Sequence, residues 1–475
     1  MEQFEKMLDA IDGVIWGPVL IVLILLVGIW LTVRTKFLQV FHLPKALKFM
    51  VQNEEGGDGE VSSFGALCTA LSATIGTGNI VGVATAVFGG GPGALFWMWL
   101  AAFFGMATKY AEGLLAVKYR VLTPEGKALG GPFYYIERGM GKKWKWLAIL
   151  FAIFGVGAGL FGIGTLTQVS SMTDAIGGFF DPENVNIAFT LGGIDYSWAV
   201  VIGGIIITLC VALVVIGGIK RIANVTQVVV PFMAIIYVVF CLVVLGCNIK
   251  QVPAAFAEIF TSAFGFKQMA FGGLGAIIAA ATSGISRGIF SNEAGLGSAP
   301  IAAAAAKTKE PVRQGLVSMT GTFIDTIVIC TLTGLSIVIT DAWNTGENLQ
   351  GIAITTRAFA DGTAAFLPGN VASFILMLCL IFFAFTTVLG WNYYSEKCLE
   401  YITGGKKWAN VIFRWVYIAF VFIGPYLTLE AVWTIADIFN GLMAFPNLVA
   451  LLALSGVVAK ETSNYFTVQK LNKNK

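Results

Sequence analysis

The stretch from Ser72 to Gly93, SATIGTGNIVGVATAVFGGGPG, begins inside an apolar segment, residues 64–88, that is long enough to cross a bilayer. Gly76, Gly78 and Asn79 lie at the centre of that segment. Each glycine costs about 1 kcal/mol relative to alanine in a helix, and an asparagine in a dry place needs hydrogen-bond partners. The pattern therefore predicts a helix that is interrupted inside the membrane. The alternative is that these small residues only let helices pack closely.

An interruption of this kind has a chemical consequence. It frees backbone N–H and C=O groups, which are tolerated at membrane depth only where they line a cavity or a ligand. The N-terminal end of the second half-helix favours a carboxylate, and the free carbonyls of the first half favour a cation. An amino acid carries both charges, so the stretch predicts a binding site for a small amino acid.

The composition places the whole chain in a membrane. Of its 475 residues, 57% are hydrophobic and 12% are charged, as in integral membrane proteins rather than soluble enzymes. His42 is the only histidine, and the seven cysteines show no metal-binding spacing. HExxH does not occur, and the single match to GxSxG, Gly284–Gly288, lies within the apolar segment 269–290. We therefore expect neither an enzyme nor a catalytic residue. Membrane lipid is an expected partner, whereas no nucleic acid and no obligate protein partner is expected.

Eleven apolar segments near the ~20 residues that a bilayer requires follow one another along the chain. They cover residues 14–33, 64–88, 94–117, 147–174, 198–217, 226–247, 269–290, 313–340, 371–395, 408–425 and 431–457. The loops between them are short. The sequence thus predicts an all-α polytopic membrane protein with one transmembrane transporter domain over residues 1–475.

The positive charges predict the orientation. Twenty-five of the 30 lysines and arginines fall in alternate segments, whereas four fall in the opposite segments: Lys6, Lys250, Lys267 and Arg357. The first group includes Arg287, counted with the loop 287–312. By the positive-inside rule the N-terminus lies outside and the C-terminus lies in the cytoplasm, in a plasma or inner cell membrane.

A second interruption is predicted at Phe271–Gly275, FGGLG, near the start of the seventh span, because three glycines in five residues break a helix. The second and seventh spans are five spans apart, so they cross the membrane in opposite directions. This arrangement is typical of two inverted five-helix repeats, each beginning with a broken helix. Residues 62–250 and 251–460 would form the repeats. Residues 1–61 would add an extra helix and loop, and residues 461–475 a cytoplasmic tail.

Polar and aromatic residues inside the spans are further candidates. Gln168 bonds either another helix or a ligand. Thr386 and Thr387 are adjacent hydroxyls that either bond back to the preceding turn or complete a sodium site. Trp391 lies one turn beyond Thr387 on the same helix face. It either packs between helices or walls the substrate pocket, which would exclude long side chains.

Charged residues within the spans are functional candidates by default. Asp325 is interpreted as a group that couples ion binding to transport, and Asp174 lies at the outer end of the fourth span. Lys109 and Glu112 are interpreted as an ion pair or as snorkelling groups near the interface.

Two stretches resemble signature sequences of the alanine or glycine:cation symporter family. They are TGNIVGVATAVFGGGPGALFWMWLAAFFGMATKYAEGLLAVKYR, residues 77–120, and GISRGIFSNEAGLGSAPIAAAAA, residues 284–306. The resemblance implies a symporter that imports alanine and glycine with sodium as the co-transported ion. It also implies the LeuT-type fold, whose inverted repeats work by alternating access.

The resemblance also implies roles for particular residues. The substrate carboxylate would meet backbone N–H groups of the G-x-G-N turn, and its amino group would meet carbonyls of both broken helices. The implied substrate-binding residues are Thr74, Gly76, Thr77, Gly78, Asn79, Gln168, Phe271, Gly272, Gly273 and Trp391. The implied sodium-binding residues are Ser72, Ile75, Phe383, Thr386 and Thr387. For a second ion near Asn79, Thr320 and Thr322 are candidates.

The favoured function is thus secondary active symport. A proton-coupled symporter, which would use Asp325, is the alternative. A channel would need a continuous polar pore lining, and the spans carry isolated polar residues instead.

Overall fold

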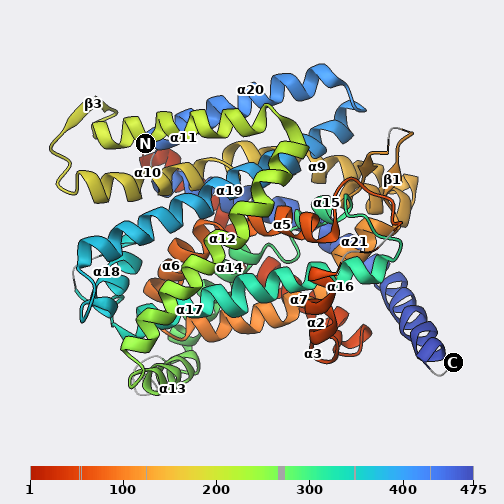
Figure 1. Cartoon of the computed structure of the whole chain (residues 1–475), viewed down its shortest axis with the longest axis horizontal. Coiled ribbons are helices and arrows are strands. Elements are labelled where there is room, and N and C mark those ends of the chain that lie inside the picture. Colours follow the sequence, from red (N-terminus) through yellow and green to blue (C-terminus); the bar gives the residue numbers. More distant parts are fainter. Residues whose placement is uncertain are drawn as a thin grey trace.

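Helices form most of the chain in the computed structural model, which describes residues 2–473 except 53, 55, 125, 266–272, 347–348 and 428 (Figure 1). The first helices are α1 (Glu2–Ile15), α2 (Pro18–Arg34), α3 (Leu38–Phe41), α4 (Leu43–Val51), α5 (Ser63–Thr74), α6 (Val83–Gly90), α7 (Ala94–Lys118), α8 (Pro132–Tyr134), α9 (Lys145–Phe161), α10 (Leu166–Phe180), α11 (Trp198–Val215) and α12 (Gly218–Cys247). The later helices are α13 (Val252–Ala263), α14 (Gly273–Asn292), α15 (Ala299–Ala303), α16 (Pro311–Thr322), α17 (Thr331–Ile339), α18 (Ile352–Thr363), α19 (Gly369–Thr403), α20 (Lys407–Ile423) and α21 (Leu429–Lys473). Short π-helical or 3-10 segments are η1 (Gly78–Gly82), η2 (Tyr135–Met140), η3 (Lys142–Trp144), η4 (Phe323–Cys330) and η5 (Gly424–Tyr426).

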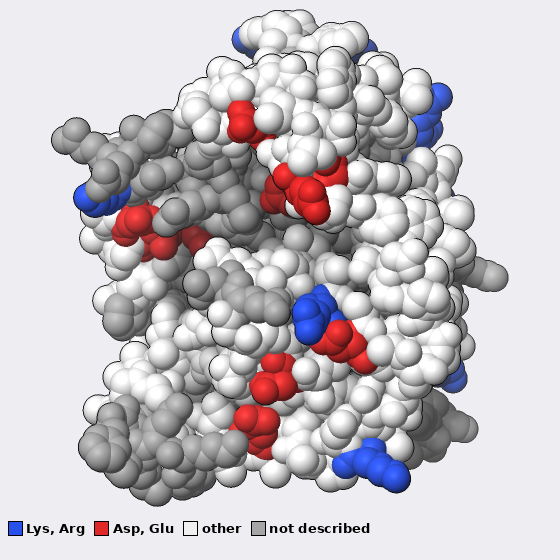
Figure 2. Space-filling view, turned by 90° about the vertical axis from the view of Figure 1, so that its left-hand side faces the viewer, with Lys and Arg blue, Asp and Glu red and all other residues white. Residues whose placement is uncertain are grey.

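Two small antiparallel hairpins lie outside the helical body. They pair β1 (Val121–Leu122) with β2 (Ala128–Leu129) and β3 (Ile187–Leu191) with β4 (Ile194–Ser197). Acidic side chains predominate on the face of the molecule that carries the second hairpin and α18 (Figure 2).

The predicted fold class is confirmed. In the described part of the chain, ten helices are long and apolar enough to cross a membrane, and one bent pair raises the total to eleven. The bent pair is Ser63–Thr74 with Gly78–Gly90, whose axes differ by 53°. The first predicted interruption therefore exists at the predicted place.

The second interruption differs from the prediction. Phe271 and Gly272 lie outside the described residues, whereas Gly273 to Gly275 form the first turn of α14. The helix continues without a break to Asn292, and the chain is irregular from 293 to 298 before α15 begins. We call the irregular segment 293–298 the second break, and the segment between α5 and η1 the first break. Tight packing occurs further along this helix, where a Cβ atom on Gly284 would lie 2.1 Å from the Ala94 carbonyl oxygen, whereas a Cβ atom on Gly275 would meet nothing within 4 Å.

The end of the seventh span also changes the charge count. Arg287 lies inside α14 and not in the following loop, so 24 lysines and arginines remain in the predicted cytoplasmic segments. The split between the two groups of segments is still strongly unequal.

Helix packing brings the interrupted segments together. α7 runs beside both α14 and α16, and α14 also contacts α6 and η1. α19 crosses the middle of the molecule, where it contacts α5, α9, α10 and α12 (Figure 1). The site described next lies where α5, η1, α14, η4 and α19 meet.

Candidate functional site

The first break is held open by two side-chain oxygens. In a continuous helix the Gly76 N–H would donate to the Ser72 carbonyl. Here it donates to Asn79 Oδ1 at 2.9 Å, and the Thr77 N–H donates to Gln168 Oε1 at 3.2 Å. The change of partner releases the Ser72 carbonyl at the end of α5. Gln168 thus bonds the break directly, from the first turn of α10.

Close approach of other helices explains the two glycines. A Cβ atom on Gly76 would lie 2.4 Å from Thr387 Oγ1 and 3.0 Å from Gln168 Oε1. A Cβ atom on Gly78 would lie 2.9 Å from the Ser291 Cα atom. Real Cβ atoms do not approach backbone atoms this closely. Glycine therefore lets α10, α14 and α19 reach the backbone of the break.

The structure brings most of the predicted sodium ligands together. Thr387 Oγ1 lies 3.3 Å from the Ile75 carbonyl oxygen and 3.1 Å from the Phe383 carbonyl oxygen. Thr386 Oγ1 lies 3.0 Å from the same Phe383 oxygen. Both hydroxyls therefore bond back to the preceding turn, and Thr387 also reaches the break. Ser72 is buried one turn before Ile75, in the last turn of α5.

A fully buried carboxylate connects the two breaks. Asn79 Nδ2 donates to Asp325 Oδ1 at 2.8 Å and to the Asp325 carbonyl at 3.2 Å. Ser291, near the end of α14, donates to Asp325 Oδ2 at 2.8 Å, and Thr326 donates to the same oxygen at 2.7 Å. Asp325 sits in the π-helical turn η4, a distortion often found at functional sites. The residue joins α14, η1 and η4.

The sequence prediction identified Asp325 but not the partners that position it. Ser291 and Thr326 were missed because single hydroxyl residues are common in membrane helices. Glu293 was missed because its tract was assigned to a loop. The sequence did carry a usable signal, because Glu293 precedes two glycines spaced as G-x-G. In the structure residues 293, 295 and 297 have positive φ angles of 57°, 91° and 81°.

Trp391 faces the second break. Its Nε1 donates to Glu293 Oε1 at 2.8 Å, and Ser298 donates to the other oxygen of the same carboxylate. The indole is fully buried, with its ring centre 5.6 Å from that of Tyr394. Trp391 therefore ties α19 to the irregular segment 293–298.

Gly273 does not lie at this site. Asn292 follows it by 19 positions in one continuous helix, a length of about 28 Å at 1.5 Å per residue. Because Ser291 and Asn292 adjoin the first break, Gly273 lies at the opposite end of α14 from that break. The predicted carbonyl ligands Phe271 and Gly272 lie outside the described residues.

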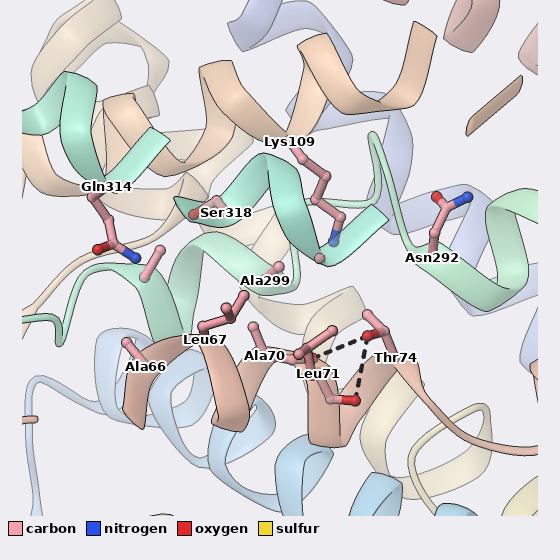
Figure 3. Close-up of a pocket in the computed structure, with 12 residues that line it drawn as sticks. Ala66, Leu67, Ala70, Leu71, Thr74, Lys109, Asn292, Ala299, Gln314 and Ser318 are labelled. Atoms are coloured by element: carbon pink, nitrogen blue, oxygen red, sulfur yellow. Dashed lines mark hydrogen bonds between the residues drawn. The ribbon is translucent and has the colours of Figure 1, made fainter. Parts of the chain in front are cut away.

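Lys109 and Glu112 differ from their interpretation as an ion pair or interfacial groups. Both are buried, and among the described residues no acceptor reaches Lys109 Nζ. Glu112 Oε1 instead accepts from Asn447 Nδ2 at 2.7 Å and from the Gly295 N–H at 3.2 Å. Side-chain direction explains the difference: Lys109 enters a cavity beside α5, which is also lined by Thr74 (Figure 3).

The remaining candidates lie elsewhere. Asp174 lines a separate cavity between α10, α18 and α19. Thr320 Oγ1 donates to the Val317 carbonyl at 2.6 Å, a bond within its own helix. Thr322 is buried near Gly105, and no described residue bonds its hydroxyl.

Known proteins resemble this chain over its full length. The model described as the sodium:alanine symporter family matches residues 1–475. An uncharacterized transporter of Haemophilus influenzae is 53% identical over 471 residues, which cover 98% of this chain and 97% of that protein. The sodium/alanine symporter AgcS of Methanococcus maripaludis is 47% identical over 474 residues, which cover 98% of each chain.

A solved structure supports the architecture. MhsT in complex with L-phenylalanine matches with a TM-score of 0.56 and 14% identity, over 87% of this chain and 99% of that one. At this identity the likeness shows the fold alone, and the fold is of the LeuT type. Because the family model covers every residue and a named symporter is nearly half identical, this chain belongs to the sodium:alanine symporter family of membrane transporters.

Proposed function

We propose that this protein is a secondary active symporter that imports alanine and glycine together with sodium. The family and the AgcS relative support amino-acid symport with sodium. The observation that carries the proposal is the position of Thr387, whose hydroxyl lies between the Phe383 carbonyl and the Ile75 carbonyl at the break.

The sodium site would use five oxygens. The carbonyls of Ser72, Ile75 and Phe383 and the hydroxyls of Thr386 and Thr387 are neutral, hard ligands of the kind that such cations prefer. Each threonine hydroxyl would turn its hydrogen away from the ion and present a lone pair instead. With one sodium ion, a potential of ~100 mV supplies ~2.3 kcal/mol, enough for roughly 40-fold accumulation of substrate.

The substrate carboxylate would bind at the N–H groups of Gly76–Asn79. Gln168 Oε1 accepts from the Thr77 N–H, which marks that group as available to an acceptor oxygen. A carboxylate is a stronger acceptor than an amide oxygen, so it would displace Gln168 from Thr77. The substrate's amino group would meet the Thr74 carbonyl and the free carbonyls at the end of α14, near Ser291.

Trp391 would limit the size of the substrate. The residue follows Thr387 by one helical turn and is held rigidly by its bond to Glu293. A fixed indole next to the substrate side chain leaves room for a hydrogen or a methyl group. A rigid wall can reject larger side chains more strongly than the ~1–3 kcal/mol that one methylene contributes through favourable contacts.

A proton-coupled symporter is the second candidate, and the burial of Asp325 favours it. A fully buried carboxylate bonded to Asn79, Ser291 and Thr326 could carry a proton between the two faces of the membrane. Sodium dependence at constant pH separates the two candidates.

The proposal also covers the orientation of the chain in the membrane and its division into two inverted repeats. The N-terminus would lie outside and the C-terminus in the cytoplasm of the plasma or inner membrane, with residues 62–250 and 251–460 as inverted repeats. The unequal distribution of basic residues supports this orientation.

One experiment tests the function. Purified protein in proteoliposomes should accumulate labelled alanine when a sodium gradient is directed inward. It should not do so with potassium in place of sodium, or with a proton gradient alone. Accumulation driven by protons without sodium would favour the second candidate, and no saturable alanine uptake under any gradient would refute both.

A further inference from the structure

Lys109 carries an ammonium group in the interior of the protein. Its side chain extends from α7 into a small cavity between α5, α15 and α16, and the residue is 3% exposed (Figure 3). Within the described ranges no acceptor lies at hydrogen-bonding distance from its Nζ atom. A buried charge is costly unless opposite charges compensate for it, so the surroundings of this ammonium must contain its counter-charges.

Three buried carboxylates provide that compensation. Glu112, Glu293 and Asp325 are all completely buried, and each interacts electrostatically with Lys109. None is close enough to form an ion pair with it among the described residues, and neutral donors bond each of them instead. These donors are the Gly295 N–H and Asn447 for Glu112, Trp391 and Ser298 for Glu293, and Asn79, Ser291 and Thr326 for Asp325.

The ammonium thus interacts with several carboxylates and forms an ion pair with none of the described ones. Asp325 bonds the first break through Asn79, and Glu293 begins the second break. A sodium ion at the proposed site of neutral oxygens would add a positive charge beside the first break, which Asp325 contacts through Asn79, and its departure would remove that charge. A lysine side chain has four flexible bonds, so the ammonium can move toward these carboxylates once the ion has left.

We propose that Lys109 is a tethered counter-cation, which compensates the buried carboxylates after the transported ion has left and thereby lets the empty carrier return. The inference rests on the symport proposed above and deepens it. Lys109 is a positioning residue here, because it acts through the carboxylates and does not touch the substrate. It matters for the return of the empty carrier and not for substrate exchange, in which the carrier returns loaded.

The test compares two transport modes in proteoliposomes. Net uptake of labelled alanine requires the return of the empty carrier, whereas exchange of labelled for unlabelled alanine at equal sodium on both sides does not. Lys109→Met keeps the length and removes the charge, and Lys109→Arg keeps the charge. Lys118→Met on the same helix is the control, since Lys118 pairs with Glu461 at the surface.

Lys109→Met should lower net uptake by roughly tenfold or more while exchange changes less than about twofold, because an uncompensated buried charge raises the barrier of the empty step alone. Lys109→Arg should retain net uptake, and Lys118→Met should change neither mode. Equal loss of both modes in Lys109→Met and Lys109→Arg, or unchanged net uptake in Lys109→Met, would overturn the proposal. Absence of alanine exchange in the unmodified protein would instead refute the proposed function.

Discussion

Trp391 on α19 donates a hydrogen bond of 2.8 Å to Glu293 at the start of the second break, 98 residues earlier in the chain. Both residues are completely buried. The bond fixes the indole with respect to the irregular segment 293–298, and the other carboxylate oxygen is bonded by Ser298. A bulky side chain is thereby held in one orientation beside a segment of backbone that carries no regular helix.

The first prediction concerns this residue and the size of the substrate. Trp391→Ala should admit serine, valine or leucine and weaken alanine binding, because the wall and its contacts are both removed. Trp391→Phe should still exclude leucine, although loss of the bond to Glu293 should lower stability by about 1–3 kcal/mol. Competition assays with purified protein measure the first effect and thermal unfolding the second.

A folded Trp391→Ala variant that binds alanine normally and still rejects leucine would show that another residue sets the substrate size. The phenylalanine variant serves as the control for the loss of the hydrogen bond, because it retains most of the aromatic volume.

The second prediction concerns sodium. Thr387→Val keeps the shape of the side chain but removes one of the five proposed oxygen ligands. The sodium concentration for half-maximal alanine uptake should rise roughly 10- to 100-fold, which corresponds to the ~1.5–3 kcal/mol of a polar contact with a charged group. High sodium should restore uptake.

Matched variants isolate the ligand effect. Thr387→Ser retains a hydroxyl and should leave the sodium dependence nearly unchanged. Thr320→Val removes a hydroxyl that bonds only within its own helix, to the Val317 carbonyl, and should also have little effect. An unchanged sodium dependence in the double variant Thr386→Val and Thr387→Val would eliminate the proposed site.

The third prediction concerns the backbone of the break. In Gly76→Ala the new methyl group would lie 2.4 Å from Thr387 Oγ1, so the Thr387 side chain would have to turn away or the break and α19 would have to separate. Overpacking of this kind costs typically 1–3 kcal/mol, and both alanine and sodium binding should weaken. Thermal shift with and without each ligand measures both effects.

Gly275→Ala provides the control. This glycine lies in α14, and a Cβ atom there would meet nothing within 4 Å. We expect an unchanged or slightly higher stability, by up to about 1 kcal/mol, because alanine is the better helix former. If Gly76→Ala behaved like Gly275→Ala, close approach at the break would not be required.

The fourth prediction concerns orientation. Asn186, beside β3, and Lys142, in η3, are both exposed and lie on opposite sides of the predicted membrane. In a background from which the exposed Cys210 and Cys247 have been removed, Asn186→Cys should react with an impermeant thiol reagent added to intact cells. Lys142→Cys should react only after the cells are opened. The reverse pattern would place the N-terminus inside.

Several features of this protein follow from the sequence because their causes are local. The number of spans reflects the length of apolar segments, and the first break reflects two glycines and an asparagine within four residues of one span. The adjacent hydroxyls of Thr386 and Thr387 could be related to that break through the resemblance to a known fold. In the structure Thr387 Oγ1 lies 3.3 Å from the Ile75 carbonyl oxygen.

Other features were decided only by tertiary structure. FGGLG has the composition of a break, yet its last three residues are helical, and the chain breaks instead at 293–298. There Glu112 and Asn447 bond the backbone of Gly295, and Trp391 bonds the Glu293 side chain. Asp325, Asn79 and Ser291 come from three segments, and Lys109 enters a cavity instead of pairing with Glu112. Local propensity can be read along a chain. Which buried polar groups meet depends on the directions in which side chains leave helices that are far apart in sequence, and only packing sets those directions.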